Sequence, residues 1–468
     1  MNSVLPDANM KDYMVLLRSS STKLSAAAFS ALFLLYGSPA AVAAPNGAGQ
    51  AGNAAIHEVD VTNMPATKEG QPTVAVNPRN PKNLVFVSTI FPPSPGLEPV
   101  DGGCFLAYSN DRGDTWTQVA WPLGDTAPKC GEPSVQFDAK GTVYVDNNQV
   151  SSGLDANLVN HNQVAKSTDG GKTWTDPVST PLLLGGAPKM RVDAATGKVY
   201  AVAGAAWEYP SAISVSADGG KTFSSDSRVI PGPMPCIEVA PGIPLVCGYP
   251  GREIAVYGGI LVSASQEAGK PVNFHVSRDD GKTWTNTTVN DGQGTPVPAG
   301  TGSLVPTPGL GAAADPVPWV AADPSHRGRF AVMVPRDSNT LDVYVTPDAG
   351  KTWNGPTTIA TPNAQRPAID FGTNGDLGVM WRTTTGDAFS VVSFDHGRSF
   401  SSPVRVNHVT EPVGEMGPPG DRWSGITIAG GYAYVTWADG RNNSSLDSNL
   451  SRVPLKLYKK RTASQATN

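Results

Sequence analysis

The sequence predicts an all-β fold built from a repeated unit, and three observations lead to this prediction. The eight-residue phrase Ser/Thr-x-Asp-x-Gly-x-Thr/Ser-Trp/Phe occurs six times, and its copies start at residues 109, 167, 216, 277, 346 and 393. Glycine and proline number 50 and 42 among 468 residues, which is typical of a chain with many tight turns. Long amphipathic helical patterns are absent from the sequence after residue 43. Six copies of one phrase indicate a repeat architecture.

The phrase has the composition of a turn between two strands. Each copy follows an apolar or alternating run, so it lies where a strand must reverse. Its Asp is suited to accept hydrogen bonds from backbone N–H groups two or three residues further on, and its Gly can adopt a positive φ. The Trp or Phe then starts the next strand and buries a large apolar surface. We therefore interpret the aspartates of the phrase as structural and not catalytic: Asp111, Asp169, Asp218, Asp279, Asp348 and Asp395.

The phrase resembles the Asp-box, or BNR repeat, of the sialidase-like β-propellers. The resemblance covers most of the chain after residue 43 and implies a β-propeller. It does not select a substrate, because Asp-boxes also occur in xyloglucanase-like, sortilin-like and photosystem-assembly propellers.

Seven inner hairpins can be counted independently of the boxes. Their first strands are expected at 73–76, 134–137, 190–193, 254–257, 319–322, 368–371 and 425–428. Six hairpins precede a box, and the seventh precedes residues 453–458, which we expect to form a third strand. Residues 56–61 would supply the missing outer strand of the last blade, since closing the ring in this way removes an exposed edge. We predict seven four-stranded antiparallel blades. The alternative is six blades with one decorating hairpin, because the bacterial sialidases that share the motif have six.

The N-terminal region has the pattern of a secretory signal peptide. An apolar stretch at 24–36 follows Arg18 and Lys23 and precedes the small residues 41–43. The stretch is short for a membrane span, although an uncleaved anchor is the alternative. We predict a signal peptide at 1–43, a flexible linker at 44–54, one propeller domain at 55–460 and a disordered tail at 461–468. The protein is expected to be secreted or periplasmic.

Cysteine count and charge limit the cofactors and partners. Four cysteines in an exported chain suggest two disulfides, which we expect to be Cys104–Cys130 and Cys236–Cys247, at about 3 kcal/mol each. Free buried thiols are the alternative. A net charge of −5 without a basic stripe argues against a nucleic-acid binder. No cysteine or histidine spacing matches a zinc site, so we expect no metal and no cofactor. We expect a monomer without a membrane span after signal cleavage.

The candidate binding site is the rim of the central channel where the inner strands start. Alignment of the seven hairpins places polar and charged residues at this rim: Gln71, Glu132, Lys189, Arg252, Glu253, Gln365, Arg366 and Arg422. Guanidinium groups from separate blades suit a carboxylate, because each can donate two parallel hydrogen bonds. An aromatic residue beside an arginine at a channel mouth suits a sugar ring with an acidic group. The predicted substrate-binding residues are Lys189, Arg252, Arg366, Arg422 and Trp423.

Catalytic residues are harder to assign. Resemblance to the sialidases implies three arginines on the sugar carboxylate, a Tyr–Glu pair as nucleophile and an Asp as acid/base, which departs from the usual scheme of two carboxylates. Here Gln71-Pro72-Thr73 stands where the family carries Arg-Ile-Pro, and no tyrosine occupies an inner-strand start. The remaining catalytic candidates are Glu132, Glu253 and Tyr249.

Two classes of function remain open. The first is a secreted sialidase-like propeller that acts on or binds glycans, as an exo-glycosidase if it is an enzyme. The alternative is a non-catalytic extracytoplasmic propeller that serves as a scaffold for glycans or proteins, with an assembly factor as a minor variant. The sequence lacks the nucleophile elbow of serine hydrolases and the phosphate-binding loop.

Overall fold

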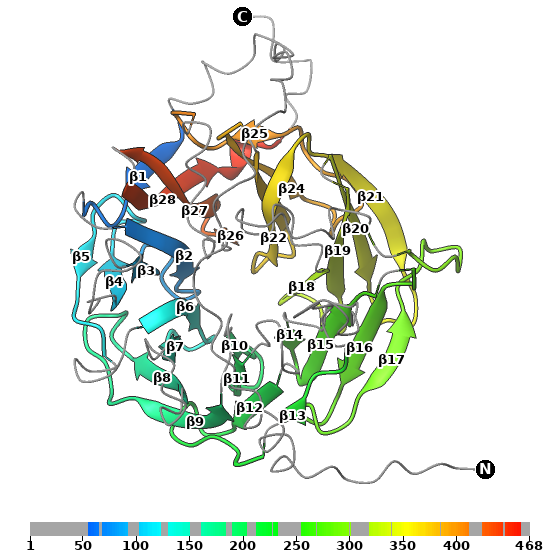
Figure 1. Cartoon of the computed structure of the whole chain (residues 1–468), viewed down its shortest axis with the longest axis horizontal. Coiled ribbons are helices and arrows are strands. Elements are labelled where there is room, and N and C mark those ends of the chain that lie inside the picture. Colours follow the sequence, from blue (N-terminus) through cyan, green and yellow to red (C-terminus); the bar gives the residue numbers. More distant parts are fainter. Residues whose placement is uncertain are drawn as a thin grey trace, which may run out of the picture. The chain divides into compact units, whose positions relative to one another are not determined.

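The computed structural model shows seven four-stranded antiparallel sheets arranged as a β-propeller (Figure 1). The chain divides into two compact units, Met1–Ala48 and Gly49–Asn468, and all the residues described here belong to the second. The described residues are 55–64, 68–91, 103–122, 130–149, 161–183, 190–203, 212–226, 228–232, 254–267, 269–298, 300, 318–337, 339–383, 385–410, 424–442 and 445–459. Within these ranges, no helix has the length and apolar character needed to span a bilayer.

Each blade is a meander of four strands, and the blades follow the chain. Blade 1 contains β2 (Lys68–Val76), β3 (Leu84–Phe91), β4 (Gly103–Ser109) and β5 (Thr117–Gln118). Blade 2 contains β6 (Cys130–Phe137), β7 (Val143–Gln149), β8 (His161–Ser167) and β9 (Val178–Leu183). Blade 3 contains β10 (Arg191–Val192), β11 (Val199–Ala203), β12 (Ala212–Ser216) and β13 (Arg228–Val229). Blade 4 contains β14 (Ile254–Tyr257), β15 (Ile260–Ser265), β16 (Asn273–Ser277) and β17 (Thr285–Thr288). Blade 5 contains β18 (Trp319–Ala322), β19 (Phe330–Asp337), β20 (Thr340–Thr346) and β21 (Asn354–Ala360). Blade 6 contains β22 (Ala364–Phe371), β23 (Leu377–Thr383), β24 (Ala388–Ser393) and β25 (Val404–Arg405). Blade 7 contains β26 (Gly425–Ala429), β27 (Tyr432–Asn442), β28 (Ser445–Pro454) and β1 (His57–Asp60), and η1 (Leu455–Leu457) follows it.

The ring closes as predicted, with the first strand of the chain completing the last blade. Strand β1 pairs antiparallel with β28, from His57 opposite Arg452 to Asp60 opposite Asn449. This pairing covers the edge of β28 and joins the two ends of the propeller. The prediction of seven blades is confirmed.

The predicted third strand of blade 7 was misplaced. It was expected at 453–458, but the strand is β28 (Ser445–Pro454), and the next three residues form a 3₁₀-helix. The sequence of β28 looks too polar for a buried strand, yet Ser448 and Ser451 are fully buried. The Ser448 hydroxyl lies 2.6 Å from the Ser88 hydroxyl, and Ser451 Oγ donates to the Val406 carbonyl at 2.7 Å. These hydrogen bonds offset the cost of burying the hydroxyls, so the strand tolerates a polar sequence.

The core lies between the blades. Buried side chains form seven apolar clusters, and each cluster combines residues from two neighbouring blades. The second strands are buried on both faces, and every residue of β15 and β23 is buried. This burial explains the near-continuous apolar runs in the sequence.

The six boxes form closed turns between the third and fourth strands. Asp169 accepts hydrogen bonds from Ser167 Oγ at 2.7 Å, Thr173 N at 3.0 Å and Thr173 Oγ1 at 2.6 Å, and the other boxes repeat this pattern. The backbone donors therefore lie three and four residues after the aspartate, and not two or three as expected. The glycine has a positive φ in every copy, and so does the residue before it: Arg112, Gly170, Gly219, Asp280, Ala349 and His396.

Candidate functional site

Most of the predicted site residues lie outside the described part of the chain. These residues are Lys189, Tyr249, Arg252, Glu253, Arg422 and Trp423, together with Cys236 and Cys247. Glu132 lies in β6, but only its backbone is described, and the same holds for Cys130 at the start of that strand. Cys104 lies in β4, and the disulfide pairing stays a prediction. Arg366 is the one predicted substrate-binding or catalytic residue whose side chain is described, and the rim residues Gln71 and Gln365 are described as well.

Arg366 lies at an irregular point of the inner strand of blade 6. The pairing between β22 and β23 shifts between Gln365 and Ala368, and Arg366 has a φ of 50° immediately before a proline. Gln71 repeats this arrangement in blade 1 with a φ of 58°, and the register of β6 shifts around Glu132. Bulges change the direction of a side chain and concentrate near functional sites, and a positive φ is costly for residues other than glycine. Three blades therefore carry the same local distortion at this rim.

A second arginine lies beside Arg366. Arg382 is near the end of β23, where it pairs with Gln365. The exposed fractions of Arg366 and Arg382 are 8% and 3%, and both side chains also interact within the protein. Arg382 was missed in the sequence because only the starts of the inner strands were considered. At the same rim, blades 1 and 7 bury the acidic residues Glu69 and Asp447. Blade 6 differs from these two blades because its buried charged residues are arginines.

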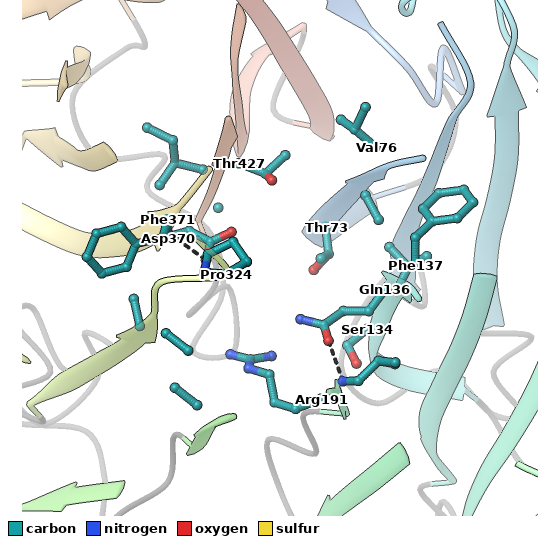
Figure 2. Close-up of a pocket in the computed structure, with 18 of the residues that line it drawn as sticks. Thr73, Val76, Ser134, Gln136, Phe137, Arg191, Pro324, Asp370, Phe371 and Thr427 are labelled. Atoms are coloured by element: carbon teal, nitrogen blue, oxygen red, sulfur yellow. Dashed lines mark hydrogen bonds between the residues drawn. The ribbon is translucent and has the colours of Figure 1, made fainter. Parts of the chain in front are cut away.

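A cavity of about 470 Å³ runs through the centre of the propeller and is lined by the inner strands of all seven blades (Figure 2). Among the described residues that line it, Arg191 on β10 is the one with a positive charge. Asp370 on β22 and Asp138 are the acidic ones. Asp138 is engaged in its own turn, because its carboxylate accepts hydrogen bonds from Lys140 N and Thr142 N, both at 2.8 Å.

Backbone contacts hold Arg191 and Gln136 in place. Arg191 Nε donates to the Ile254 carbonyl at 3.0 Å, and Nη1 donates to the Met190 carbonyl at 3.1 Å. Gln136 Oε1 accepts a hydrogen bond from Val192 N at 2.7 Å, so the amide nitrogen of Gln136 points into the channel (Figure 2).

A buried carboxyl group lies behind this wall. Asp146 Oδ1 accepts hydrogen bonds from the Ser134 hydroxyl at 2.5 Å and from Ser134 N at 3.1 Å. The Ser134 hydroxyl in turn accepts from Met190 N at 3.1 Å, which links blade 2 to blade 3. Burial raises the pKa of Asp146 to about 6, although the hydrogen bonds and the charge of Arg191 act in the opposite direction.

Asp370 forms part of the opposite wall of the channel. Its Oδ1 accepts a hydrogen bond from Phe371 N at 2.9 Å, and the Thr427 hydroxyl also bonds to the carboxyl group. Desolvation raises the pKa of Asp370 to about 6, and the positive charge of Arg191 partly counteracts this effect. Arg191 and Asp370 were not among the predicted site residues. The signal that could have identified them is a charged residue inside an otherwise apolar inner strand.

A Ser–His–Asn arrangement lies in blade 4. Ser265 Oγ and His275 Nε2 lie 2.7 Å apart, and His275 Nδ1 lies 2.7 Å from Asn286 Oδ1. Ser265 is fully buried, so no substrate can reach its hydroxyl. Burial lowers the pKa of His275, which favours a neutral, structural imidazole. Within the described ranges, no three His, Cys, Asp or Glu side chains are grouped to hold a metal ion.

Comparisons with known proteins concern the fold. No family model and no curated protein matches the sequence. A protein of unknown function from Dyadobacter fermentans DSM 18053 is 12% identical, with a TM-score of 0.45, over 86% of this chain and 99% of that chain. The Hadza microbial sialidase Hz136 is 14% identical, with a TM-score of 0.43, over 84% of this chain and 66% of that chain. An α-L-arabinofuranosidase from Fusarium graminearum is 14% identical, with a TM-score of 0.41, over 85% of this chain and 95% of that chain. At these identities the likeness extends to the propeller fold alone.

Proposed function

We propose that this chain is an extracytoplasmic propeller that recognises a glycan carrying an acidic sugar at the rim where the inner strands start. The observation that carries the proposal is the pair of buried arginines of blade 6, one of them on a distorted strand. The planar fork of a guanidinium group matches a carboxylate, to which it can donate two parallel hydrogen bonds. The signal-peptide pattern at 24–36 supports export, and Arg252, Arg422, Trp423 and Lys189 would complete the site.

A binding measurement tests the proposal with two matched ligands. Sialyllactose carries a carboxylate that lactose lacks, so calorimetry with both sugars isolates the contribution of the acidic group. We expect sialyllactose to bind and lactose to bind at least about tenfold more weakly, because charged hydrogen bonds contribute roughly 1.5–3 kcal/mol. Arg366→Lys and Arg382→Lys keep the charge but lose the bidentate geometry, so each should weaken sialyllactose binding.

The matched control is Arg398→Gln, which removes an exposed arginine from the box of blade 6. This variant should bind sialyllactose like the wild type. Thermal unfolding of each variant separates loss of binding from loss of fold. Equal affinity for the two sugars, or unchanged affinity in both folded lysine variants, would contradict the proposal.

Hydrolysis of the same glycan is the second candidate function. It is favoured by the position of Glu132, whose strand is irregular at the same rim. Release of the aryl group from an aryl sialoside tests it, with Glu132→Gln, Glu253→Gln and Tyr249→Phe as variants. Turnover that one of these changes abolishes would identify an enzyme. Binding without turnover would support the non-catalytic scaffold.

A further inference from the structure

We propose that the central channel holds a second site, separate from the rim, that binds a small zwitterion such as a free α-amino acid with an apolar side chain. The site is built from Gln136 and Arg191 on one wall and Asp370 with Thr427 on the other (Figure 2). It does not depend on the function proposed for the rim.

The polar groups lie at one depth in the channel. Gln136 pairs with Tyr144, Arg191 with Tyr200 and Asp370 with Gly378, and each of these partners is the second residue of the following strand. The three side chains therefore occupy equivalent positions in blades 2, 3 and 6. Asp370 lies four residues beyond Arg366 on β22, or about 13 Å at the usual rise of a strand. The channel site is thus distinct from the arginine pair at the rim.

The first wall is suited to a carboxylate. Arg191 supplies a positive charge that two backbone carbonyls hold in place. The oxygen of the Gln136 amide is occupied by Val192 N, so its NH₂ group is the part presented to the channel. No described residue accepts a hydrogen bond from that NH₂ group. Two fixed donors on neighbouring blades form a compact binding place for an anionic group.

The second wall is suited to an ammonium group. The Asp370 carboxyl receives hydrogen bonds from Phe371 N and the Thr427 hydroxyl, and a carboxylate can accept about four hydrogen bonds. A ligand with only a carboxylate would add negative charge to a channel whose lining already carries two carboxyl groups, Asp138 and Asp370, against one guanidinium group, Arg191. A zwitterion has no net charge, so it leaves the net charge of the channel unchanged. Its ammonium group would face Asp370 and its carboxylate Arg191.

The rest of the cavity fits the apolar part of such a ligand. Around the polar groups the lining comes from the inner strands and is mostly apolar, although the rings of Phe137 and Phe371 pack into the clusters between the blades. A volume of about 470 Å³ lies in the range of pockets for small molecules. The lining also includes residues of the inner-hairpin turns: Pro78, Ala139, Ala194, Pro324 and Thr373. The cavity therefore reaches the face that carries these turns, opposite the rim where the inner strands start.

A ligand series tests this site on the intact wild-type protein. The probes are L-leucine, 4-methylpentanoate, which lacks the ammonium group, and 3-methylbutylamine, which lacks the carboxylate. We expect L-leucine to bind in calorimetry and both analogues to bind at least about tenfold more weakly, since each leaves one wall without its charged partner. No binding of L-leucine, or binding of either analogue as tight as that of L-leucine, would overturn the proposal.

A variant then locates the site. Asp370→Asn keeps the shape of the side chain and removes its charge, so it should lower the affinity for L-leucine about tenfold or more and leave the weak binding of 4-methylpentanoate unreduced. Asp176→Asn removes an exposed aspartate between β8 and β9, the two outer strands of blade 2, and should bind L-leucine like the wild type. Unchanged L-leucine affinity in folded Asp370→Asn would refute the assignment. If that variant does not fold, the ligand series on the wild type still decides the question, and sialyllactose binding at the rim is measured separately.

Discussion

At the scale of single residues, the structure contains two opposite kinds of aspartate. The box aspartates accept several hydrogen bonds each, and the hydroxyl of Thr283 together with its backbone N–H lowers the pKa of Asp279 to about 2. Asp146 and Asp370 are enclosed by protein, and desolvation raises the pKa of each to about 6. The sequence alone does not separate the two kinds, because the difference is set by surroundings that only the folded chain provides.

These shifts predict the dependence of stability on pH. A box aspartate has a lowered pKa in the folded protein, so its contribution is present above about pH 4 and is lost as the pH falls toward 2. Asp146 and Asp370 bind a proton more tightly in the folded protein than in the unfolded chain, so their effect is to raise stability as the pH falls from 7 through 6 toward 4. We expect a maximum of the melting temperature at mildly acidic pH. Asp370→Asn should flatten the change between pH 7 and 5, and parallel profiles for variant and wild type would contradict this assignment.

At the scale of elements, the box turn depends on two consecutive residues with positive φ. The phrase predicts this conformation for its glycine but not for the residue before it, which is an alanine, an aspartate or a histidine in some copies. The first position differs between copies: it is open at Gly219, whereas a Cβ at Gly170 would lie 2.9 Å from the Asn83 side chain. The second position lies against the neighbouring blade. A Cβ at Gly219 would meet no atom closer than 3.4 Å, but a Cβ at Gly281 would overlap the side chain of Ile213.

The two positions should therefore respond differently to alanine. Gly219→Ala is expected to lower the free energy of unfolding by about 1 kcal/mol, the cost of a left-handed conformation for a residue with a Cβ. Gly281→Ala adds the overlap with Ile213 and should cost at least about twice as much. Urea unfolding of both variants measures the difference. Equal costs would show that the neighbouring blade moves away without resistance.

The sequence predicted the elements better than the site. Apolar alternation located the inner hairpins of all seven blades, the box located the third turn of six of them, and the unpaired run at 56–61 predicted the outer strand of the seventh. The prediction from sequence failed for β28, where polar residues form a buried strand. The hydrogen bonds that permit this burial join residues far apart in the chain, so no local pattern reveals them. The rim residues were predicted from the starts of the inner strands, which included Arg366 but not Arg382. Arg382 lies at the rim because β23 pairs with β22 in the register that places it opposite Gln365, and the sequence does not give this register. Arg191 and Asp370 were missed for the same reason, because their common depth in the channel depends on the pairing of strands.

At the scale of the whole molecule, the seven apolar clusters make each blade depend on its neighbours. Leu450 on β28 belongs to the cluster between blades 7 and 1, where the two ends of the propeller meet, and Leu261 belongs to the cluster between blades 3 and 4. Both leucines are 1% exposed. In a closed ring the two contacts between blades are equivalent, although one joins residues from opposite ends of the chain and the other joins consecutive segments.

Leu450→Ala and Leu261→Ala should therefore have similar effects. Each removes a buried side chain between two blades and should lower the free energy of unfolding by about 2–5 kcal/mol. Val409→Ala, at a position that is 53% exposed, should cost less than about 0.5 kcal/mol. Because closure makes unfolding cooperative, we expect a single transition in guanidinium chloride with an unchanged slope in all three variants. A separate transition at lower guanidinium chloride concentration in Leu450→Ala alone would contradict this expectation. It would show that blade 7 unfolds independently of the other blades, and that the pairing of β1 with β28 is less stable than the other contacts of the ring.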